Sequence, residues 1–197
     1  MTNPEIKNDG TMCWYQNGLL HRDDDLPAVI LCNGTRYWYQ PGQLHRDKGL
    51  PAVIMADGTM CWYQNGQRHR DGDKPAVERL NGDKEWYQRG QLHRDKGLPA
   101  IVLADGTVCW YQHDQLHRDR DLPARILSNG TKEWYCNGKR HRNKGPAVSM
   151  ADGTKYWFQN NLLHRDKGPA ILWADGTKYW FRNGEQIDPP TKESTKN

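Results

Sequence analysis

Long apolar segments are missing from this 197-residue sequence, which excludes several classes of protein. Leu26–Cys32 is typical of the longest apolar runs, and a membrane-spanning helix needs about 20 such residues. The first residues form neither a basic n-region nor an apolar h-region, so no secretory signal is expected. The hydrophobic fraction is 36% and the mean hydropathy is −1.02. We therefore expect neither a membrane protein nor a large globular core.

Cysteine is scarce, and neither sign of charge dominates. The five cysteines are an odd number and form no Cys-x-x-Cys pair, so neither a disulfide framework nor a zinc site is expected. The 28 Lys and Arg residues are interspersed with 24 Asp and Glu residues, for a net charge of +4. This balance suits a soluble surface better than a dedicated nucleic-acid arm. We expect a protein of the reducing cytoplasm, without a cofactor.

Tryptophan and tyrosine, nine of each, are abundant and follow a fixed period. Eight tryptophans are separated by steps of 24 residues five times and then 23 residues twice: Trp14, Trp38, Trp62, Trp86, Trp110, Trp134, Trp157 and Trp180. Each is followed by an aromatic residue: Tyr15, Tyr39, Tyr63, Tyr87, Tyr111, Tyr135, Phe158 and Phe181. Such self-similarity is the signature of a repeat architecture.

One repeat, residues 51–69, shows the expected local structure. Ala52–Met55 is a short apolar run typical of a strand. Asp57-Gly58 predicts a type I′ hairpin turn into a second strand, residues 59–64. Asn65-Gly66 then turns the chain into a connecting segment that could hold a short third strand. No helical period is visible, and a hairpin must stack on its neighbours to be stable.

The fold class predicted is therefore all-β, an elongated tandem array of about eight 23–24-residue β-hairpin repeats that form a twisted antiparallel sheet. We expect an N-terminal lead over residues 1–7, the array over residues 8–187, and a polar C-terminal tail over residues 188–197. Because side chains alternate between the faces of a strand, Trp62 is expected to face away from Tyr63. The tryptophans would form one column, assigned a structural role, and the Tyr and Phe rings another.

Odd and even repeats differ through the first six. The residue before Trp reads Cys13, Tyr37, Cys61, Glu85, Cys109 and Glu133, and the turn residue before Gly alternates between Asp and Asn. The array could have grown by duplication of a two-repeat block, or its structure could have a two-repeat period; the pattern alone is compatible with both.

The segment from Ala56-Asp57-Gly58-Thr59 through Trp62-Tyr63-Gln64-Asn65-Gly66 to His69 resembles the MORN repeat family. The resemblance covers about residues 8–187 and implies consecutive antiparallel hairpins in an extended, twisted sheet. It is similar to the MORN-variant arrays of bacterial antitoxin-type proteins and of viral or phage genomes, which would place a viral member in the host cytoplasm. His-Arg stands here where MORN units have His-Gly, a Pro-Ala pair is added, and the Tyr-x-Gly-x-Trp start is absent.

Motifs that could carry catalysis or bind metal recur too often to mark one site. His-Arg-Asp occurs at residues 21–23, 45–47, 69–71, 93–95, 117–119 and 164–166, without the other motifs of a kinase. We expect its Arg to lie across a Trp or Tyr ring, and its Asp to pair with that Arg or to accept N–H groups of the turn. Repeat histidines about 10 Å apart cannot share one Zn²⁺ ion. No catalytic residue and no metal ligand is assigned.

The aromatic columns are the candidate binding surface. We expect a non-enzymatic scaffold that binds a macromolecule, most simply a protein, as a stoichiometric inhibitor would. Aromatic and Arg side chains are typical of such interfaces. Single-stranded nucleic acid, or a carbohydrate or choline ligand, is the alternative. The oligomeric state stays open. The candidate binding residues are Tyr15, Tyr39, Tyr63, Tyr87, Tyr111, Tyr135, Arg46, Arg70, Arg94 and Arg118.

Overall fold

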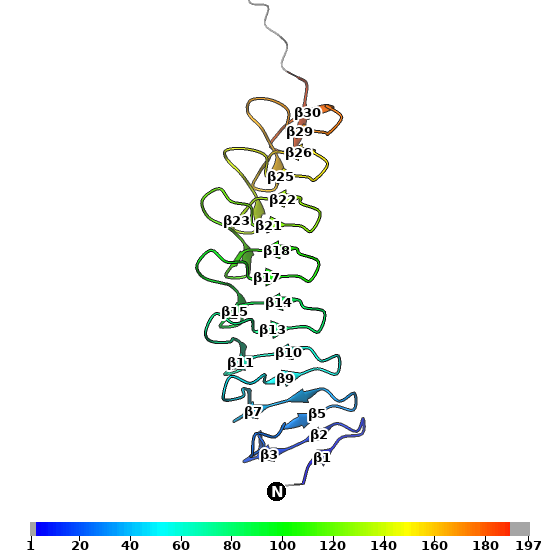
Figure 1. Ribbon diagram of the computed structural model, residues 1–197, viewed down its shortest axis with the longest axis vertical. Coiled ribbons are helices and arrows are strands. Elements are labelled where there is room, and N and C mark those ends of the chain that lie inside the picture. The colour runs from blue at the N-terminus through cyan, green and yellow to red at the C-terminus, as the bar shows by residue number, and fades with distance from the viewer. Residues whose placement is uncertain (1–2, 190–197) are drawn as a thin grey trace, which may run out of the picture. The chain divides into compact units, whose positions relative to one another are not determined.

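A computed structural model describes residues 3–189 of the chain. Over these residues it contains 31 short strands and no helix (Figure 1). The predicted all-β array of tandem antiparallel hairpins is confirmed. The chain divides into two compact units, one ending at Ala104 and the other beginning at Asp105, which we call the N-terminal and C-terminal units.

Each repeat contains two hairpins, whereas the sequence predicted one hairpin and a connecting segment that could hold a short third strand. In the third repeat, β9 (Val53–Ile54) pairs with β10 (Met60–Cys61), and β11 (Tyr63–Gln64) pairs with β12 (Gln67–Arg68). The first hairpin joins a long sheet, and the second forms a separate two-stranded sheet. Trp62 lies between β10 and β11, outside both strands.

The type I′ turn lies at a different place from the one predicted. Asn65 and Gly66 have φ values of 49° and 77°, as that turn requires, whereas at the first turn only Gly58 is left-handed, at 81°. There the Met55 N–H donates to the Thr59 carbonyl and the Gly58 N–H to the Met55 carbonyl. The Asp57 carboxylate accepts the Thr59 N–H at 2.8 Å. Asp57 therefore acts through its side chain, so its backbone keeps a right-handed conformation.

In the N-terminal unit the first hairpins form one antiparallel sheet in chain order, beginning with a strand inside the predicted lead (Figure 1). Its strands are β1 (Glu5–Ile6), β2 (Met12–Cys13), β5 (Val29–Ile30), β6 (Arg36–Tyr37), β9, β10, β13 (Val77–Glu78), β14 (Lys84–Glu85) and β17 (Ile101–Val102). The second hairpins are β3 (Tyr15–Gln16) with β4 (Leu19–Leu20), β7 (Tyr39–Gln40) with β8 (Gln43–Leu44), β11 with β12, and β15 (Tyr87–Gln88) with β16 (Gln91–Leu92).

The C-terminal unit repeats this plan. Its long-sheet strands are β18 (Val108–Cys109), β21 (Arg125–Ile126), β22 (Lys132–Glu133), β25 (Val148–Ser149), β26 (Lys155–Tyr156), β29 (Ile171–Leu172) and β30 (Lys178–Arg182). Its second hairpins are β19 (Tyr111–Gln112) with β20 (Gln115–Leu116), β23 (Tyr135–Cys136) with β24 (Lys139–Arg140), β27 (Phe158–Gln159) with β28 (Leu162–Leu163), and β30 with β31 (Glu185–Ile187).

The core is thin and repeats with the array. The Ala of each Pro-Ala pair is almost fully buried, and its carbonyl accepts the Trp backbone N–H, as Ala76 does from Trp62 at 2.8 Å. Val53, Cys61 and Val77 form a buried cluster on one face of the sheet, against which Tyr63 packs. Each hairpin thus packs against and bonds to residues of the next repeat, as expected for a stacked array.

Candidate functional site

An arginine lies over every tryptophan ring of the first seven repeats. The distance from the guanidinium carbon to the ring centroid is 3.5–4.0 Å, within reach of a cation–π interaction. In each stack the Arg follows the Trp by eight residues. The pairs are Trp14–Arg22, Trp38–Arg46, Trp62–Arg70, Trp86–Arg94, Trp110–Arg118, Trp134–Arg142 and Trp157–Arg165. The predicted stacking of Arg on an aromatic ring is confirmed.

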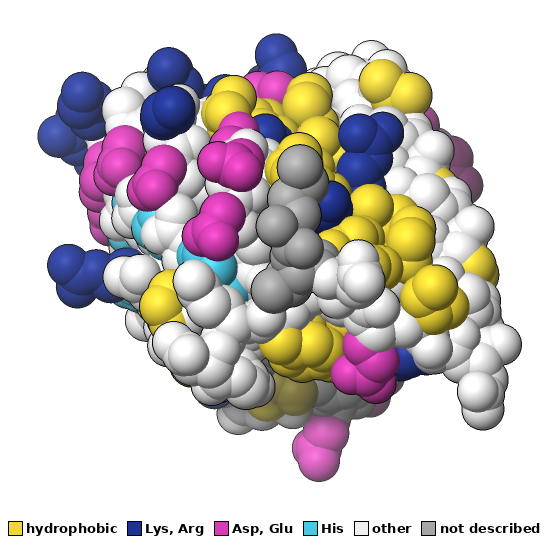
Figure 2. Space-filling view, turned by 90° about the horizontal axis from the view of Figure 1, so that it is seen from below, with side chains coloured by type: hydrophobic (Ala, Val, Ile, Leu, Met, Phe, Trp, Pro, Cys, Tyr) yellow, Lys and Arg dark blue, Asp and Glu magenta, His cyan; other side chains and the backbone are white. Residues whose placement is uncertain are grey.

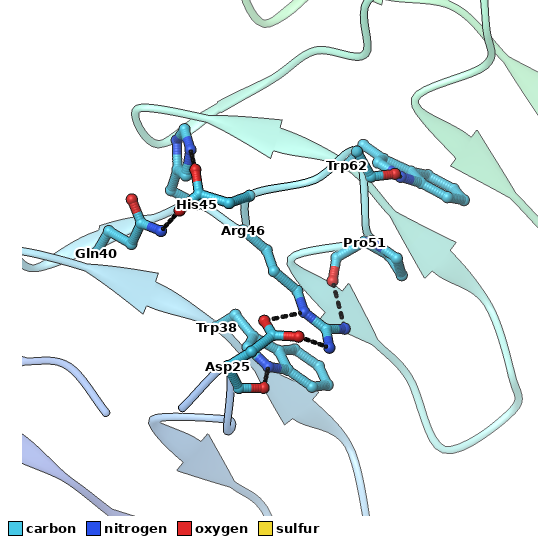
Figure 3. A network of polar contacts seen from close by, with 9 residues as sticks. Asp25, Trp38, Gln40, His45, Arg46, Pro51 and Trp62 are labelled. Carbon is cyan, nitrogen blue, oxygen red and sulfur yellow. Dashed lines mark hydrogen bonds and ion pairs between the residues drawn. The ribbon is translucent and has the colours of Figure 1, made fainter. Parts of the chain in front are cut away.

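The Asp of the His-Arg-Asp motif pairs with His instead of Arg. The His45 Nε2 lies 3.2 Å from one Asp47 oxygen, and the Gln40 amide donates to the other at 2.6 Å (Figure 3). The Nδ1 atom of His45 accepts the backbone N–H of Asn65 from the next repeat, at 3.3 Å. This arrangement places the ring proton on Nε2. The histidine of the motif therefore links one repeat to the next, and both of its ring nitrogens make hydrogen bonds within the protein.

In three repeats the stacked Arg binds the carboxylate of an Asp from the preceding repeat. Arg46 donates from Nε and Nη2 to the two oxygens of Asp25, each at 2.7 Å, and from Nη1 to the Pro51 carbonyl (Figure 3). The same bidentate pair joins Arg94 to Asp73 and Arg142 to Asp121. In all three pairs these hydrogen bonds hold the pKa of the Asp carboxyl below its usual value.

These pairs recur every second repeat. At the position of Asp25 and Asp73, the intervening loops carry Gly49 and Gly97. The stacked arginines of the odd repeats consequently lack this partner. Arg70 pairs with Glu78 at 2.9 Å, while neither Arg118 nor Arg165 contacts a carboxylate in the described residues, and burial lowers the pKa of both. The alternation of Asp and Gly at this loop position therefore gives the structure a period of two repeats.

The tryptophan column lies mostly inside the array. The first six rings are buried, and Trp157 and Trp180 are half-buried. The indole Nε1 of Trp62 donates to the Gly49 carbonyl at 2.8 Å, and Trp38, Trp86 and Trp134 make the same bond thirteen residues back. Each of these rings is thus held by a neighbouring loop and by its own Arg.

The tyrosine column is more accessible. Tyr15 is 36% exposed, and Tyr39, Tyr63, Tyr87, Tyr111 and Tyr135 are half-buried. Across the second hairpins the Tyr residues pair with Leu or Arg, as Tyr39 does with Leu44 and Tyr63 with Arg68. In the N-terminal unit we call the surface formed by Tyr15, Tyr39, Tyr63 and Tyr87 with their partners Leu20, Leu44, Arg68 and Leu92 the tyrosine face. In the C-terminal unit Tyr111 and Tyr135 pair in the same way with Leu116 and Arg140.

Arg68 fixes two of these rings in place. It donates to the Tyr63 hydroxyl at 3.1 Å and to the Tyr87 hydroxyl at 3.3 Å, and Tyr87 donates to Glu85 at 2.9 Å. Burial and the Glu85 carboxylate raise the pKa of Tyr87 to about 12. The Tyr87 ring is therefore neutral near neutral pH, and hydrogen bonds hold both hydroxyl groups in place, so a partner would not have to order these side chains.

The ten candidate binding residues fall into two environments. Tyr15, Tyr39, Tyr63 and Tyr87 line the tyrosine face, and Tyr111 and Tyr135 take the same places in the C-terminal unit. Arg46, Arg70, Arg94 and Arg118 instead stack on tryptophans beside the loop that runs from His-Arg to Pro-Ala, which we call the His-Arg loop side. The Arg46 and Arg94 side chains are 14% and 15% exposed. Sequence reasoning missed Arg68, Asp25 and Asp73; for the two Asp residues, the signal available was their alternation with Gly in the loops before Pro-Ala.

Neither a metal-binding cluster nor a membrane-spanning helix is present in the described residues. Residues 3–189 hold no cluster of His, Cys, Asp and Glu side chains able to bind a metal ion, and no helix there is long and apolar enough to cross a membrane. In the end-on view of Figure 2, histidine and acidic side chains gather on one side, and most of the visible hydrophobic ones on the other. No protein-family model matches the sequence, and no curated protein matches it.

Proposed function

We propose that this protein is a non-enzymatic scaffold whose tyrosine face binds a protein partner. The observation that carries the proposal is the recurrence, in successive repeats, of a half-buried Tyr beside a Leu or Arg on the second hairpin. Tyr and Arg are enriched in binding hot spots, and Tyr offers a large contact area at a low entropic cost. Arg68, which already bonds two tyrosines, adds charge to that surface.

The opposite side of the repeat is less suited to a partner. There the arginines are stacked on tryptophan, and in three repeats the two oxygens of an Asp accept from Nε and Nη2 of the guanidinium while a Pro carbonyl accepts from Nη1. A partner competing for these groups would have to break bonds that already stabilise the fold. This favours the tyrosine face as the surface of recognition.

The mechanism that fits such a surface is stoichiometric occlusion. A repeated array can cover a long strip of a partner and block its active or assembly surface without chemistry of its own. The same residue types recur in each repeat, so no unique acid, base or nucleophile is provided. The resemblance to MORN-variant antitoxin-type and phage arrays favours an inhibitor acting in the cytoplasm.

Affinity capture with matched variants tests the proposal. Tagged wild-type protein, Tyr39→Ala and Leu50→Ala are recovered from the native cell and the bound proteins identified by mass spectrometry. Leu50 is a 39% exposed residue of the His-Arg loop side and serves as the control. A partner held at a fixed ratio by the wild type and Leu50→Ala, and lost from Tyr39→Ala, supports the tyrosine face.

Two results would contradict it. Loss of the partner from Leu50→Ala alone would move binding to the loops. Co-purifying nucleic acid, seen as a raised ratio of absorbance at 260 and 280 nm and removed by nuclease, would favour single-stranded nucleic acid as the ligand. Circular dichroism of all three proteins separates loss of binding from loss of fold.

A further inference from the structure

The last repeat tryptophan, Trp180, differs from the seven before it. In those repeats the residue eight positions later is the Arg that stacks on the ring, but after Trp180 that residue is Asp188. The residue seven positions later, His in the other repeats, is Ile187. Within the described residues no guanidinium lies over the Trp180 ring, which is half-buried. The eighth repeat thus has the tryptophan without its cation.

The backbone around Trp180 still resembles that of a complete repeat. Elsewhere the N–H seven residues after Trp bonds to the Trp carbonyl, as His164 does to Trp157 at 3.0 Å. In the eighth repeat, Ile187 pairs with Trp180 across β30 and β31. Asp188 therefore stands at the chain position from which an arginine reaches the ring, but its side chain is too short to cover it.

A cavity opens at this point. It has a volume of about 580 Å³ and is lined by Trp180, Ile187, Asp188, Asp166, Arg165, Arg182, Lys167 and Gly168. Three clefts at corresponding junctions, where Arg46, Arg94 or Arg142 is present, have volumes of about 280, 220 and 250 Å³. The larger volume at Trp180 is what omission of the stacking side chain would leave.

The seven filled stacks indicate which ligand suits the empty one. In each, a flat guanidinium covers the indole, and in three of them a carboxylate binds its edge. The cavity at Trp180 offers an indole, the Asp188 carboxylate, and Ile187 as an apolar contact for an alkyl stem. Its second carboxylate, Asp166, already pairs with His164 at 3.1 Å, but Arg118 and Arg165 show that an arginine of this fold stacks on tryptophan without a carboxylate partner among the described residues. This is the set of groups that recognises an arginine side chain.

Three positive residues, Arg165, Lys167 and Arg182, line the cavity. A lysine lines each of the three other clefts as well, so Arg182 is the one additional cation here. Arg165 is already placed over Trp157, at 3.9 Å, and donates to the Pro169 carbonyl at 3.1 Å. The equivalent neighbour, Arg70, lines the cleft that Arg94 occupies. A second guanidinium beside the first is therefore the normal arrangement of this fold.

We propose that the cavity over Trp180 accepts an arginine side chain of the protein partner, so that the partner completes the last stack of the array. This inference rests on the proposed function, because it takes the occupant to be a protein. It adds a cation-specific contact at the end of the array to the apolar contacts of the tyrosine face.

Ligand-observed NMR with a blocked peptide, acetyl-Gly-Arg-Gly-amide, tests the site on the full-length protein. Stacking on the indole should move the Arg side-chain proton signals upfield, with a Kd on the order of 1 mM for a single exposed cation–π contact. The same peptide with citrulline, which is uncharged, should bind at least 10-fold more weakly. Trp180→Ala should abolish the upfield shift.

Two further variants keep the test independent of folding defects. Asp188→Arg should fill the cavity from within and reduce peptide affinity at least 10-fold. Gln186→Arg adds an arginine to the same strand at an exposed position away from the cavity, and should leave affinity within 2-fold of the wild type.

Four outcomes would overturn the proposal. These are equal binding of the citrulline peptide, undiminished binding by Asp188→Arg, binding of free L-arginine but not of the blocked peptide, and binding only after deletion of residues 190–197. The third would indicate a free amino acid as ligand, and the fourth would make the chain's own C-terminal segment the occupant. None of them depends on whether the tyrosine face captures a partner, so the two proposals can fail separately.

Discussion

Arg46 binds both carboxylate oxygens of Asp25, 21 residues earlier, through Nε and Nη2 at 2.7 Å each. Asp25 has a left-handed backbone, with φ at 55°, at the position where the next loop has Gly49 at 67°. A non-glycine residue in this conformation costs roughly 1–2 kcal/mol. The bidentate ion pair offsets that strain, and it joins the repeats in pairs.

The same relationship at Asp73 and Arg94 leads to a first prediction. Asp73 has φ at 54°, so Asp73→Ala loses the ion pair and keeps the strain, whereas Asp73→Gly loses the ion pair and relieves the strain. We expect Asp73→Ala to be about 1–2 kcal/mol less stable than Asp73→Gly. Chemical denaturation measures the difference. Equal stabilities would mean that the left-handed backbone carries no strain at this site.

The ion pairs also predict acid sensitivity. Hydrogen bonds from Arg46, Arg94 and Arg142 lower the pKa of their Asp partners in the folded state. Their contribution to stability is therefore fully present above the unfolded pKa of about 3.9 and is lost as pH falls through the lower folded pKa.

A variant with Asp25, Asp73 and Asp121 all replaced by Gly should consequently lose less stability than the wild type as pH is lowered from 5 toward 2. Melting curves across this range provide the measurement. The other Asp residues are common to both proteins, so their titration cancels in the comparison. Parallel pH profiles for the two proteins would show that these carboxylates titrate normally in the folded state.

The sequence predicted the class and period of the fold because one dominant pattern, Trp followed by an aromatic ring every 23–24 residues, marks every repeat. It also predicted that the Arg of His-Arg stacks on a Trp or Tyr ring, without deciding between the two. It did not predict that Asp25 binds Arg46, because Asp25 belongs to the preceding repeat. The sequence pointed instead to Asp47, which follows Arg46 directly but pairs with His45. Contacts between repeats depend on stacking geometry, which local patterns do not contain.

The turn assignment was wrong for a related reason. Asp-Gly and Asn-Gly both favour a type I′ turn, but Asp57 uses its carboxylate to accept the Thr59 N–H at 2.8 Å and keeps a right-handed backbone. The choice between turn types is therefore made by a side-chain hydrogen bond. The sequence already shows that no His-Arg follows Trp180. Only the structure shows that a cavity lies over this ring.

Adjacent aromatic residues should differ in their contribution to stability. Trp62 is 5% exposed and its indole bonds to the Gly49 carbonyl, whereas Tyr63 is half-buried at the tyrosine face. We expect Trp62→Ala to cost about 3–5 kcal/mol. Tyr63→Ala should cost roughly 1–3 kcal/mol, since less area is uncovered and its hydroxyl bond to Arg68 is lost.

Denaturation of both variants, together with the affinity for a captured partner, checks this difference. Tyr63→Ala should weaken partner binding in protein that remains folded. If the two variants are equally unstable and the folded Tyr63→Ala fraction binds normally, both columns are structural and recognition lies elsewhere.

The cysteines provide a test of the packing that needs no substitution. Cys13, Cys61 and Cys109 are buried beside the tyrosine column, while Cys32 and Cys136 are exposed, and all five are free. Burial raises the pKa of the Cys61 and Cys109 thiols, so the thiolate is rarer there. Brief alkylation at pH 8 followed by peptide mass spectrometry should label Cys32 and Cys136 first. Equal labelling of all five would contradict the packed core.

Deleting repeats should reveal the two-repeat period. Removing residues 33–80 takes out the second and third repeats and brings the Asp25 loop next to the repeat that carries Arg94. Asp25 then replaces Asp73 as the carboxylate partner of Arg94. Removing only residues 57–80 places the Gly49 loop before Arg94 and leaves its guanidinium without a carboxylate. Both deletions join equivalent chain positions and should give folded β proteins, because stacked arrays tolerate the loss of internal repeats.

The two deletions make opposite predictions about stability. A simple array loses stability with each repeat removed, so the 48-residue deletion, which removes twice as much, should then be the less stable. If the Arg94–Asp73 ion pair contributes to stability, the 24-residue deletion loses that contribution and the 48-residue deletion keeps an equivalent one. The 24-residue deletion should then melt at or below the melting temperature of the 48-residue deletion. Adding Gly49→Asp to the 24-residue deletion restores a carboxylate before Arg94 and should raise its melting temperature, whereas Gly49→Asn should not. A melting temperature that depends only on the number of repeats, with no response to Gly49→Asp, would show that the pairs are neighbours without energetic coupling.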